Sequence, residues 1–271
     1  MPKIVFWSPV PGLTGNTHAI LAVSTLMGIK HKAKCLLMQG NLNSRKIETS
    51  FSPYDELKNS GVFENTDIGI GALTKIVVSN KLTPATIKNY AKPVLKDRLD
   101  VLYGINSKDA EQYKLMSQNL QFVTRKAAEI YDLVFIDLPK TASDTLVKNV
   151  LSDADVIVCT VNQDIVNLTD FFGGIDKIDA IKNKPIIYVV GDYEVKSKYN
   201  LRNIKVKFRL KDPLYAVPHN YNYADACNEG NIIDFFYKNA NAEKNDYNGI
   251  FINEVDNIIQ KVIEESKIKD Y

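Results

Sequence analysis

The stretch Lys3–Ile29 limits the possible folds of this chain more than any other part of the sequence. An apolar run, Ile4–Trp7, precedes a loop with prolines and glycines, and an apolar stretch with small residues follows from Ala19 to Met27. This order predicts a buried strand, a glycine loop and a buried helix, as in phosphate-binding loops. Backbone N–H groups and the helix dipole at the start of such a helix attract an anion.

The predicted loop lacks one standard part. A lysine normally follows the last glycine of a phosphate-binding loop and a Ser or Thr follows the lysine, whereas this chain has Gly15, Asn16 and Thr17. Thr17 keeps the hydroxyl for a magnesium ion, and Asn16 puts a neutral amide in place of the lysine. Two interpretations are open: a nucleotide site with a weakened electrostatic clamp, or an ordinary strand–helix turn that carries Gly12 and Gly15.

Length and composition predict a globular chain with one large domain, residues 1–271. The hydrophobic content of 45% is ample for a sizeable core, and 24% of the residues are charged. Its net charge is +2 and lysine and arginine are scattered, so no strong nucleic-acid footprint is predicted. No window approaches the ~20 apolar residues of a membrane span. Three cysteines without a CxxC pair, Cys35, Cys159 and Cys227, are typical of core residues in a reducing cytoplasm.

Further apolar runs predict a layered sheet. Continuous rather than alternating runs indicate strands that are buried on both faces. Strands of this kind in alternation with helices predict an α/β fold with a doubly wound, mostly parallel sheet and helices on both faces. The loops after the strands should therefore share one mouth. Besides Ile4–Trp7, the predicted strands are Ala33–Met38, Leu99–Ile105, Asp132–Asp137, Asp155–Val161, Pro185–Val190 and Tyr215–Pro218.

Helical spacing and capping residues predict the connecting helices. Thr83 followed by Pro84 is typical of a helix start, and the helix should end before Pro93. The segment Ser44–Ser60 is predicted as a loop with one helical turn, and the basic, alternating segment Asn200–Leu210 as an edge strand. The other predicted helices are Asp67–Ser79, Ser107 to about Ile130, Ser143–Leu151, Asp164–Ile181 and the amphipathic Gly249–Glu265.

Three separated segments resemble the ParA/MinD superfamily of deviant-Walker P-loop ATPases, and the resemblance follows the element order of almost the whole chain. The family's loop reads roughly KGGxGKT, and the matching stretch is Pro11-Gly12-Leu13-Thr14-Gly15-Asn16-Thr17. Gly12, Gly15 and Thr17 are retained. Pro11 stands where the family has the lysine that reaches the partner's nucleotide across a dimer, and Asn16 stands where it has the phosphate lysine. The loop is thus a degenerate Walker A motif.

The second and third segments concern magnesium and water. Gln39-Gly40-Asn41 matches the family's acidic stretch, roughly DxD, so Gln39 and Asn41 replace both acids and no catalytic residue is assigned. Tyr131–Pro139, YDLVFIDLP, is very similar to the family's YDxxxIDxPP. The resemblance implies that Thr17 and Asp137 hold Mg²⁺. The alternative is that Asp137 caps the following helix.

A fourth, weaker match concerns the base. Val217-Pro218-His219-Asn220, with Ala224 and Gly230 after it, resembles the family's IPxN…A…G segment, which wraps the base. His219 then lies near the adenine, and the alternative is a surface loop histidine. The resemblance implies ATP as the ligand. The expected nucleotide contacts are Pro11, Gly12, Leu13, Thr14, Gly15, Asn16, Thr17, His18, Pro218, His219 and Asn220.

The resemblance implies a homodimeric nucleotide-binding protein whose ATP hydrolysis is weak or absent. The branch most similar to this chain is the TadZ/CpaE-like group of pilus-positioning ATPases, although we do not expect the receiver-like domain that many of its members carry ahead of the loop. The implied partners are a pilus or secretion machine or a partition complex. The implied location is cytoplasmic, at a pole or peripheral to a membrane through a partner. Two alternatives are a pseudo-ATPase scaffold that binds no nucleotide and a partition ATPase that binds DNA. Iron–sulfur carriers and tyrosine kinases of this fold are disfavoured, because the cysteine pair and the tyrosine cluster are missing.

Overall fold

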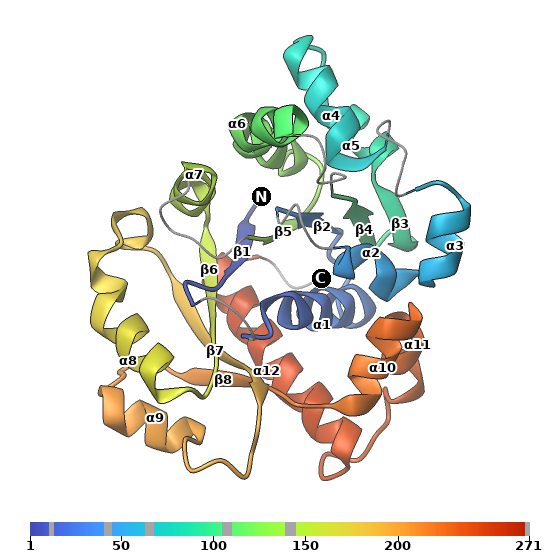
Figure 1. Cartoon of the computed structure of the whole chain (residues 1–271). Helices are drawn as coiled ribbons and strands as arrows, with labels where there is room; N and C mark the ends of the chain where they lie inside the picture. The colour runs from blue at the N-terminus through green and yellow to red at the C-terminus, as the bar shows by residue number, and fades with distance from the viewer. Residues whose placement is uncertain (11–13, 41–44, 63–67, 105–109, 139–144, 269–271) are drawn as a thin grey trace.

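The centre of the structure, a computed structural model, is an eight-stranded sheet (Figure 1). The structure describes residues 1–10, 14–40, 45–62, 68–104, 110–138 and 145–268. The strand order is β3-β4-β2-β5-β1-β6-β7-β8, and only the β3–β4 pairing is antiparallel among the described pairs. The strands are β1 (Lys3–Trp7), β2 (Cys35–Gln39), β3 (Lys92–Leu95), β4 (Leu99–Leu102), β5 (Leu133–Asp137), β6 (Val156–Val161), β7 (Ile186–Tyr193) and β8 (Leu214–Pro218).

The central strands are buried on both faces, as their continuous apolar runs predict. Every residue of β2, β5 and β6 is buried, and the side chains of each strand divide between two separate hydrophobic clusters. Val5 and Trp7 of β1 belong to one cluster, and Ile4 and Phe6 to the other. This division follows from the two-residue period of a strand. The doubly wound, mostly parallel α/β fold with helices on both faces is confirmed.

One face of the sheet is covered by helices from both ends of the chain. Helix α1 packs against α12 in the middle of this layer, and α10 and α11 lie beside them (Figure 1). Their buried side chains form a single cluster with the strands. The helices of this face are α1 (Asn16–Lys30), α2 (Lys46–Phe51), α3 (Tyr54–Asn59), α10 (Tyr221–Glu229), α11 (Ile232–Lys238) and α12 (Tyr247–Ser266).

The opposite face is covered by helices from the middle of the chain. They pack on the second hydrophobic cluster, which includes Trp7 and Tyr131. The helices of this face are α4 (Gly69–Val78), α5 (Pro84–Tyr90), α6 (Ala110–Ala127), α7 (Thr145–Asp153), α8 (Ile165–Gly174) and α9 (Leu201–Phe208), with two 3-10 turns at Ile175–Lys177 and Asp179–Ile181.

The prediction of an edge strand at Asn200–Leu210 is wrong, because this segment forms α9. Asn200 caps the helix by accepting a hydrogen bond from the Asn203 N–H at 2.9 Å. Leu201, Ile204 and Phe208 share one helical face and pack on the sheet, whereas Val206 is 70% exposed. The alternation of apolar and basic residues suggested a strand, but the helical spacing buries more apolar surface.

Three smaller expectations also differ from the structure. Ser44–Ser60 contains two short helices, α2 and α3, in place of one turn. The helix predicted over Asp164–Ile181 ends at Gly174 and continues as 3-10 turns. Strand β3 was not predicted. Thr83 caps α5 as expected, by accepting from the Thr86 N–H at 3.2 Å, and Ser107 lies outside the described residues.

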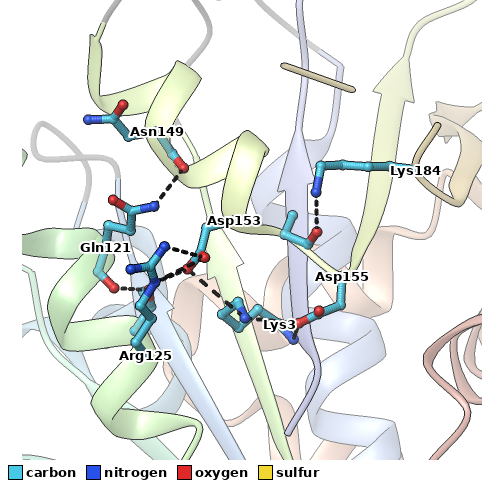
Figure 2. A network of polar contacts seen from close by, with 9 residues as sticks. Lys3, Gln121, Arg125, Asn149, Asp153, Asp155 and Lys184 are labelled. Carbon is cyan, nitrogen blue, oxygen red and sulfur yellow. Dashed lines mark hydrogen bonds and ion pairs between the residues drawn. The ribbon is translucent and has the colours of Figure 1, made fainter. Parts of the chain in front are cut away.

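Ion pairs and hydrogen bonds join strands, helices and their connections at the amino-terminal edge of the sheet (Figure 2). Lys3 of β1 pairs with Asp155 at 3.1 Å, and its N–H donates to the same carboxylate at 2.8 Å. Arg125 of α6 donates to Asp153 at the end of α7 at 2.8 Å, and Lys184 donates to the Ala154 carbonyl at 2.7 Å. The polar side chains of the candidate site, by contrast, lie at the opposite, carboxyl-terminal edge of the sheet.

In the part of the chain that the structure describes, no helix combines the length and the apolar character that crossing a bilayer requires.

Candidate nucleotide site

Among the described residues, no side chain caps the first backbone N–H groups of α1. Gly15 is the N-cap residue, with φ +68°, and it has no side chain that could accept a hydrogen bond from the first turn. The first turn also contains no acidic residue. A helix start of this kind offers N–H donors and the positive end of the helix dipole to an anion.

Asn16 joins three strands beneath this helix. Its side-chain amide donates to the Phe6 carbonyl of β1 at 3.2 Å and to Asp137 Oδ1 of β5 at 2.7 Å. Its side-chain oxygen accepts from the Thr160 hydroxyl of β6 at 2.7 Å. The side chain that occupies the position of the phosphate lysine is therefore directed into the sheet and held there.

Asp137 receives its second hydrogen bond from Thr17, whose hydroxyl donates to Oδ2 at 2.9 Å. The carboxyl group is only 1% exposed. Burial raises its pKa to about 6, although the hydrogen bonds from Thr17 and Asn16 lower it. The alternative, Asp137 as the cap of the next helix, concerns residues 139–144, which lie outside the described residues.

The carboxyl end of β7 packs against Thr14 and Gly15, which precede α1. A side chain at Gly191 would place its Cβ 2.1 Å from the Thr14 carbonyl oxygen, and one at Gly15 would approach the Asp192 nitrogen to 3.1 Å. Only glycine fits at both positions, because backbone atoms cannot yield as a flexible side chain can. The buried Thr14 and the half-buried Gly15 thus bring the start of α1 against β7.

A cavity of about 250 Å³ opens next to this junction. His18 of α1 contributes its ring, whose Nε2 is buried and has no hydrogen-bond partner among the described residues. Burial lowers the pKa of His18, as does the charge of Lys46, so the ring is neutral at pH 7. The cavity is lined by Gly15, His18, Asp192, Val217, Pro218, His219, Asn220, Tyr223 and Ala224.

His219 and Asp192 form a pair at the rim of this cavity. His219 Nδ1 lies 2.7 Å from Asp192 Oδ1, and both side chains are more than half exposed. Asn220 lines the cavity but has a structural task, since it caps α10 by accepting from the Tyr223 N–H at 2.9 Å. The cavity therefore has mixed walls, with apolar residues of β8 on one side and polar groups of His18, Asp192 and His219 on others.

The structure brings most of the predicted site residues to one edge of the sheet. Thr14, Gly15, Asn16, Thr17, His18, Asp137, Pro218, His219 and Asn220 all lie there, and the buried Gln39 pairs in register with Asp137. Pro11, Gly12, Leu13 and Asn41 lie outside the described residues.

Sequence reasoning missed Thr160, Asp192 and Tyr223. The position of Asp192 after an apolar run could have identified it, because that loop was expected at the mouth. Thr160 lies inside a strand run, where no pattern marks it.

The donor set at Thr17 and Asp137 fits a magnesium ion. Mg²⁺ takes hard oxygen ligands, and protein sites commonly supply one or two carboxylates while water and phosphate oxygens complete the shell. Thr17 offers a hydroxyl and Asp137 a carboxylate, with their oxygens 2.9 Å apart. The two residues would hold the ion beside the open start of α1, where it would balance phosphate charge.

No family sequence model and no curated protein sequence matches this chain. Solved structures do match it over nearly its whole length. The Pyrococcus horikoshii OT3 septum site-determining protein MinD, solved with Mg-ADP, matches with a TM-score of 0.71 and 17% identity, over 98% of this chain and 99% of that one. A ParA family ATPase from Chlorobium tepidum TLS matches with a TM-score of 0.70 and 13% identity, over 94% and 96%. This chain has the ParA/MinD P-loop NTPase fold.

A third ParA/MinD-like structure is a plasmid partition protein from Borrelia burgdorferi B31 bound to AMPPNP, with a TM-score of 0.66 and 17% identity, over 98% of this chain and 100% of that one. These identities are low, so the likeness establishes the ParA/MinD fold and leaves function to the residues of this chain. In this fold family the site described above is the place to look for a nucleotide, because ligands bind at the carboxyl ends of parallel strands.

Proposed function

We propose that this chain is a ParA/MinD-like nucleotide-binding protein with degenerate catalytic motifs, which acts as a dimeric, ATP-dependent positioning or assembly factor. The observation that carries the proposal is the contact of Thr17 with Asp137, next to an uncapped helix start and a cavity of about 250 Å³. N–H groups that can bind phosphate, two possible magnesium ligands and a cavity for the base then lie along a single edge of the sheet. Structural neighbours solved with Mg-ADP and with AMPPNP support the choice of ligand.

The same site argues for slow turnover. Phosphoryl transfer depends on positive groups that stabilise charge on the phosphate oxygens and on a group that positions water. Asn16 directs its amide into the sheet, and the neighbouring strand β2 ends in the neutral amide Gln39. Loss of one preorganised stabilising group costs about a hundredfold or more in rate. We therefore expect the protein to bind ATP but to hydrolyse it slowly, so that it remains in the nucleotide-bound state.

The more specific role is assembly or positioning of a pilus or secretion machine, as in the TadZ/CpaE-like branch. Its support is the eroded loop, since a protein that marks a location needs a nucleotide-dependent state more than rapid hydrolysis. A homodimer and a protein partner belong to this proposal. In the alternative, a scaffold without nucleotide, Thr17 and Asp137 would be only a structural contact.

Calorimetric titration with ATP, in the presence and absence of Mg²⁺, tests the proposal. We expect Mg²⁺ to tighten binding at least about tenfold in the natural protein, and Asp137→Ala to remove that gain, because the carboxylate is its protein ligand. Asp155→Ala is the matched control, since it removes a carboxylate from the opposite edge of the sheet. Absence of binding at millimolar ATP would establish the scaffold alternative.

A surface around α9 favours a second candidate, a partition-type protein that binds DNA. Seven basic residues and no acidic residue lie between Val195 and Lys211, although the whole chain carries a net charge of only +2. None of the seven is ion-paired within the described residues. The expectation of scattered basic residues is thereby revised. The seven are Lys196, Lys198, Arg202, Lys205, Lys207, Arg209 and Lys211.

Helix α9 directs this charge to solvent. Its apolar residues pack on the sheet and on Phe172 of α8, so Arg202, Lys207 and Arg209 remain exposed on the outer side. Cations spread along a helix and its flanking loops suit a row of phosphates, whose binding releases counterions. Val206 is the one exposed apolar side chain of the helix, which is too little for insertion into a membrane.

Fluorescence anisotropy with duplex DNA over a range of salt concentrations tests this candidate. We expect the affinity to fall steeply with salt, and Arg202→Ala with Lys207→Ala to reduce the logarithmic slope by about two, because each phosphate contact contributes about 0.9. The control is Lys238→Ala with Lys244→Ala, two exposed lysines near the C-terminal helices. Equal slopes in the two double variants would rule out α9 as the DNA surface.

A further inference from the structure

Glu48 of α2 carries a buried carboxyl group next to the hydrophobic core. Its side chain is 4% exposed. Oε1 accepts a hydrogen bond from the Gly104 N–H at 2.8 Å, while Oε2 is buried and has no partner among the described residues. Burial of a carboxylate oxygen without a partner costs several kcal/mol in general, so an oxygen in this position needs an explanation, and a bound cation is one. Burial also raises the pKa of Glu48, and the Gly104 N–H lowers it.

Glu48 lies beside the strand ends that lack the expected acids. A Cβ on Gly104 would be 3.5 Å from Glu48 Oε1 and 3.3 Å from Gln39 Cδ, so both side chains close on one backbone position. Gln39 is in turn the register partner of Asp137. Glu48, Gln39 and Asp137 thus form a polar row across α2, β2 and β5.

We infer that Glu48 supplies the second carboxylate of the cation site at Thr17 and Asp137, in place of the acids absent at Gln39 and Asn41. This inference rests on the proposed nucleotide function. A divalent cation at this edge would give Oε2 the partner that the described residues do not provide. In this arrangement Glu48 of α2 supplies the carboxylate that the end of β2 lacks.

The surroundings of Glu48 are compatible with this task. Arg45, one helical turn earlier, is the positive group that acts on the carboxyl, and its effect is smaller than that of burial. No cluster of three or more His, Cys, Asp or Glu exists in the described ranges that could hold a metal without help. A site built from Asp137, Glu48 and the Thr17 hydroxyl therefore depends on nucleotide phosphates and water to complete the shell, which is the usual mode for Mg²⁺.

Binding of Mn²⁺, used in place of Mg²⁺ and counted by electron paramagnetic resonance in the presence of AMPPNP, tests the inference without turnover. We expect Glu48→Gln to weaken Mn²⁺ binding about tenfold, because it removes the charge while its amide oxygen still accepts from Gly104. The matched control is Asp100→Asn on β4, a carboxyl that is 6% exposed and bonded to the Tyr131 hydroxyl at 2.7 Å. Its Mn²⁺ affinity should stay within about twofold of the natural protein.

The outcomes separate this inference from the proposed function. If the natural protein and Glu48→Gln bind Mn²⁺ equally, Glu48 is not part of the site and the nucleotide proposal stands. If the natural protein binds neither AMPPNP nor Mn²⁺, both fail. Should Glu48→Gln not fold, the side-chain carboxyl carbon of Glu48 is followed by NMR in the natural protein. A shift on addition of Mg²⁺ with AMPPNP supports the inference, and an unchanged resonance overturns it.

Discussion

The phosphate side and the base side of the candidate site are built on different principles. On the phosphate side, Asn16, Thr17 and Asp137 are buried or half-buried and bond mainly to one another. On the base side, His219 and Asp192 are more than half exposed, and His18 presents a buried nitrogen without a partner among the described residues. The first region is closed by its own hydrogen bonds, whereas the second is open to a ligand.

This difference shows how the start of α1 can be held in place without a lysine at position 16. A lysine in the loop would be held by a phosphate, while Asn16 is held by Phe6, Asp137 and Thr160 without one. The phosphate side is therefore stable without a ligand. We expect its substitutions to act chiefly on protein stability, and substitutions on the base side to act chiefly on nucleotide affinity.

The largest effect is expected for Asp137→Asn, as a change in the pH dependence of stability. The pKa of Asp137 is near 6 in the folded protein and about 3.8 in the unfolded chain, so the folded state binds the proton more tightly. The stability from this group is present below about pH 3.8 and lost as pH rises through 6, a loss of about 3 kcal/mol. Urea unfolding at pH 4 and pH 7 measures it.

Asp137→Asn should remove that loss, so the difference in unfolding free energy between the two proteins should grow in favour of the variant from pH 4 to pH 7. If the difference in unfolding free energy were the same at both pH values, burial would not raise the pKa of Asp137 in the folded protein. The carboxylate must also be ionised to bind Mg²⁺, so the magnesium-dependent part of ATP affinity should weaken below about pH 6.

A smaller effect is expected for Asn16→Ala, about 2 kcal/mol of destabilisation. The variant loses three hydrogen bonds and leaves the Asp137 carboxyl with one donor in place of two. Urea unfolding measures the loss. Asn167→Ala, which removes one side-chain bond to Asn162 at 3.2 Å, is the control and should cost less than about 1 kcal/mol. Equal costs would show that the phosphate side is not held by its own network.

The smallest stability effect is expected for His219→Ala, below about 0.5 kcal/mol, because the pair with Asp192 is exposed. Its ATP affinity should fall about fivefold, as for the loss of one ligand hydrogen bond. Lys182→Ala, which breaks the exposed pair with Asp179, is the control and should leave ATP binding unchanged. A loss of stability without a loss of affinity would reverse the contrast between the two sides.

The sequence by itself determined the layered fold and the edge at which the site lies. Continuous apolar runs such as those of β1, β5 and β6 can be buried only in a sheet that is covered on both faces, and parallel strands place Thr17 and Asp137 at one edge. These are local patterns with a single period, so they can be read without the tertiary structure.

Tertiary structure decided whatever depended on contacts between distant segments. The segment of α9 alternates like a strand, and only packing on the sheet selects the helical face of Leu201, Ile204 and Phe208. The role of Asn16 depends on Thr160, more than a hundred residues away along the chain, and that of Glu48 on Gly104. Hydrogen bonds of this range leave no periodic trace in a sequence, because each needs only one suitable atom at the right place in space.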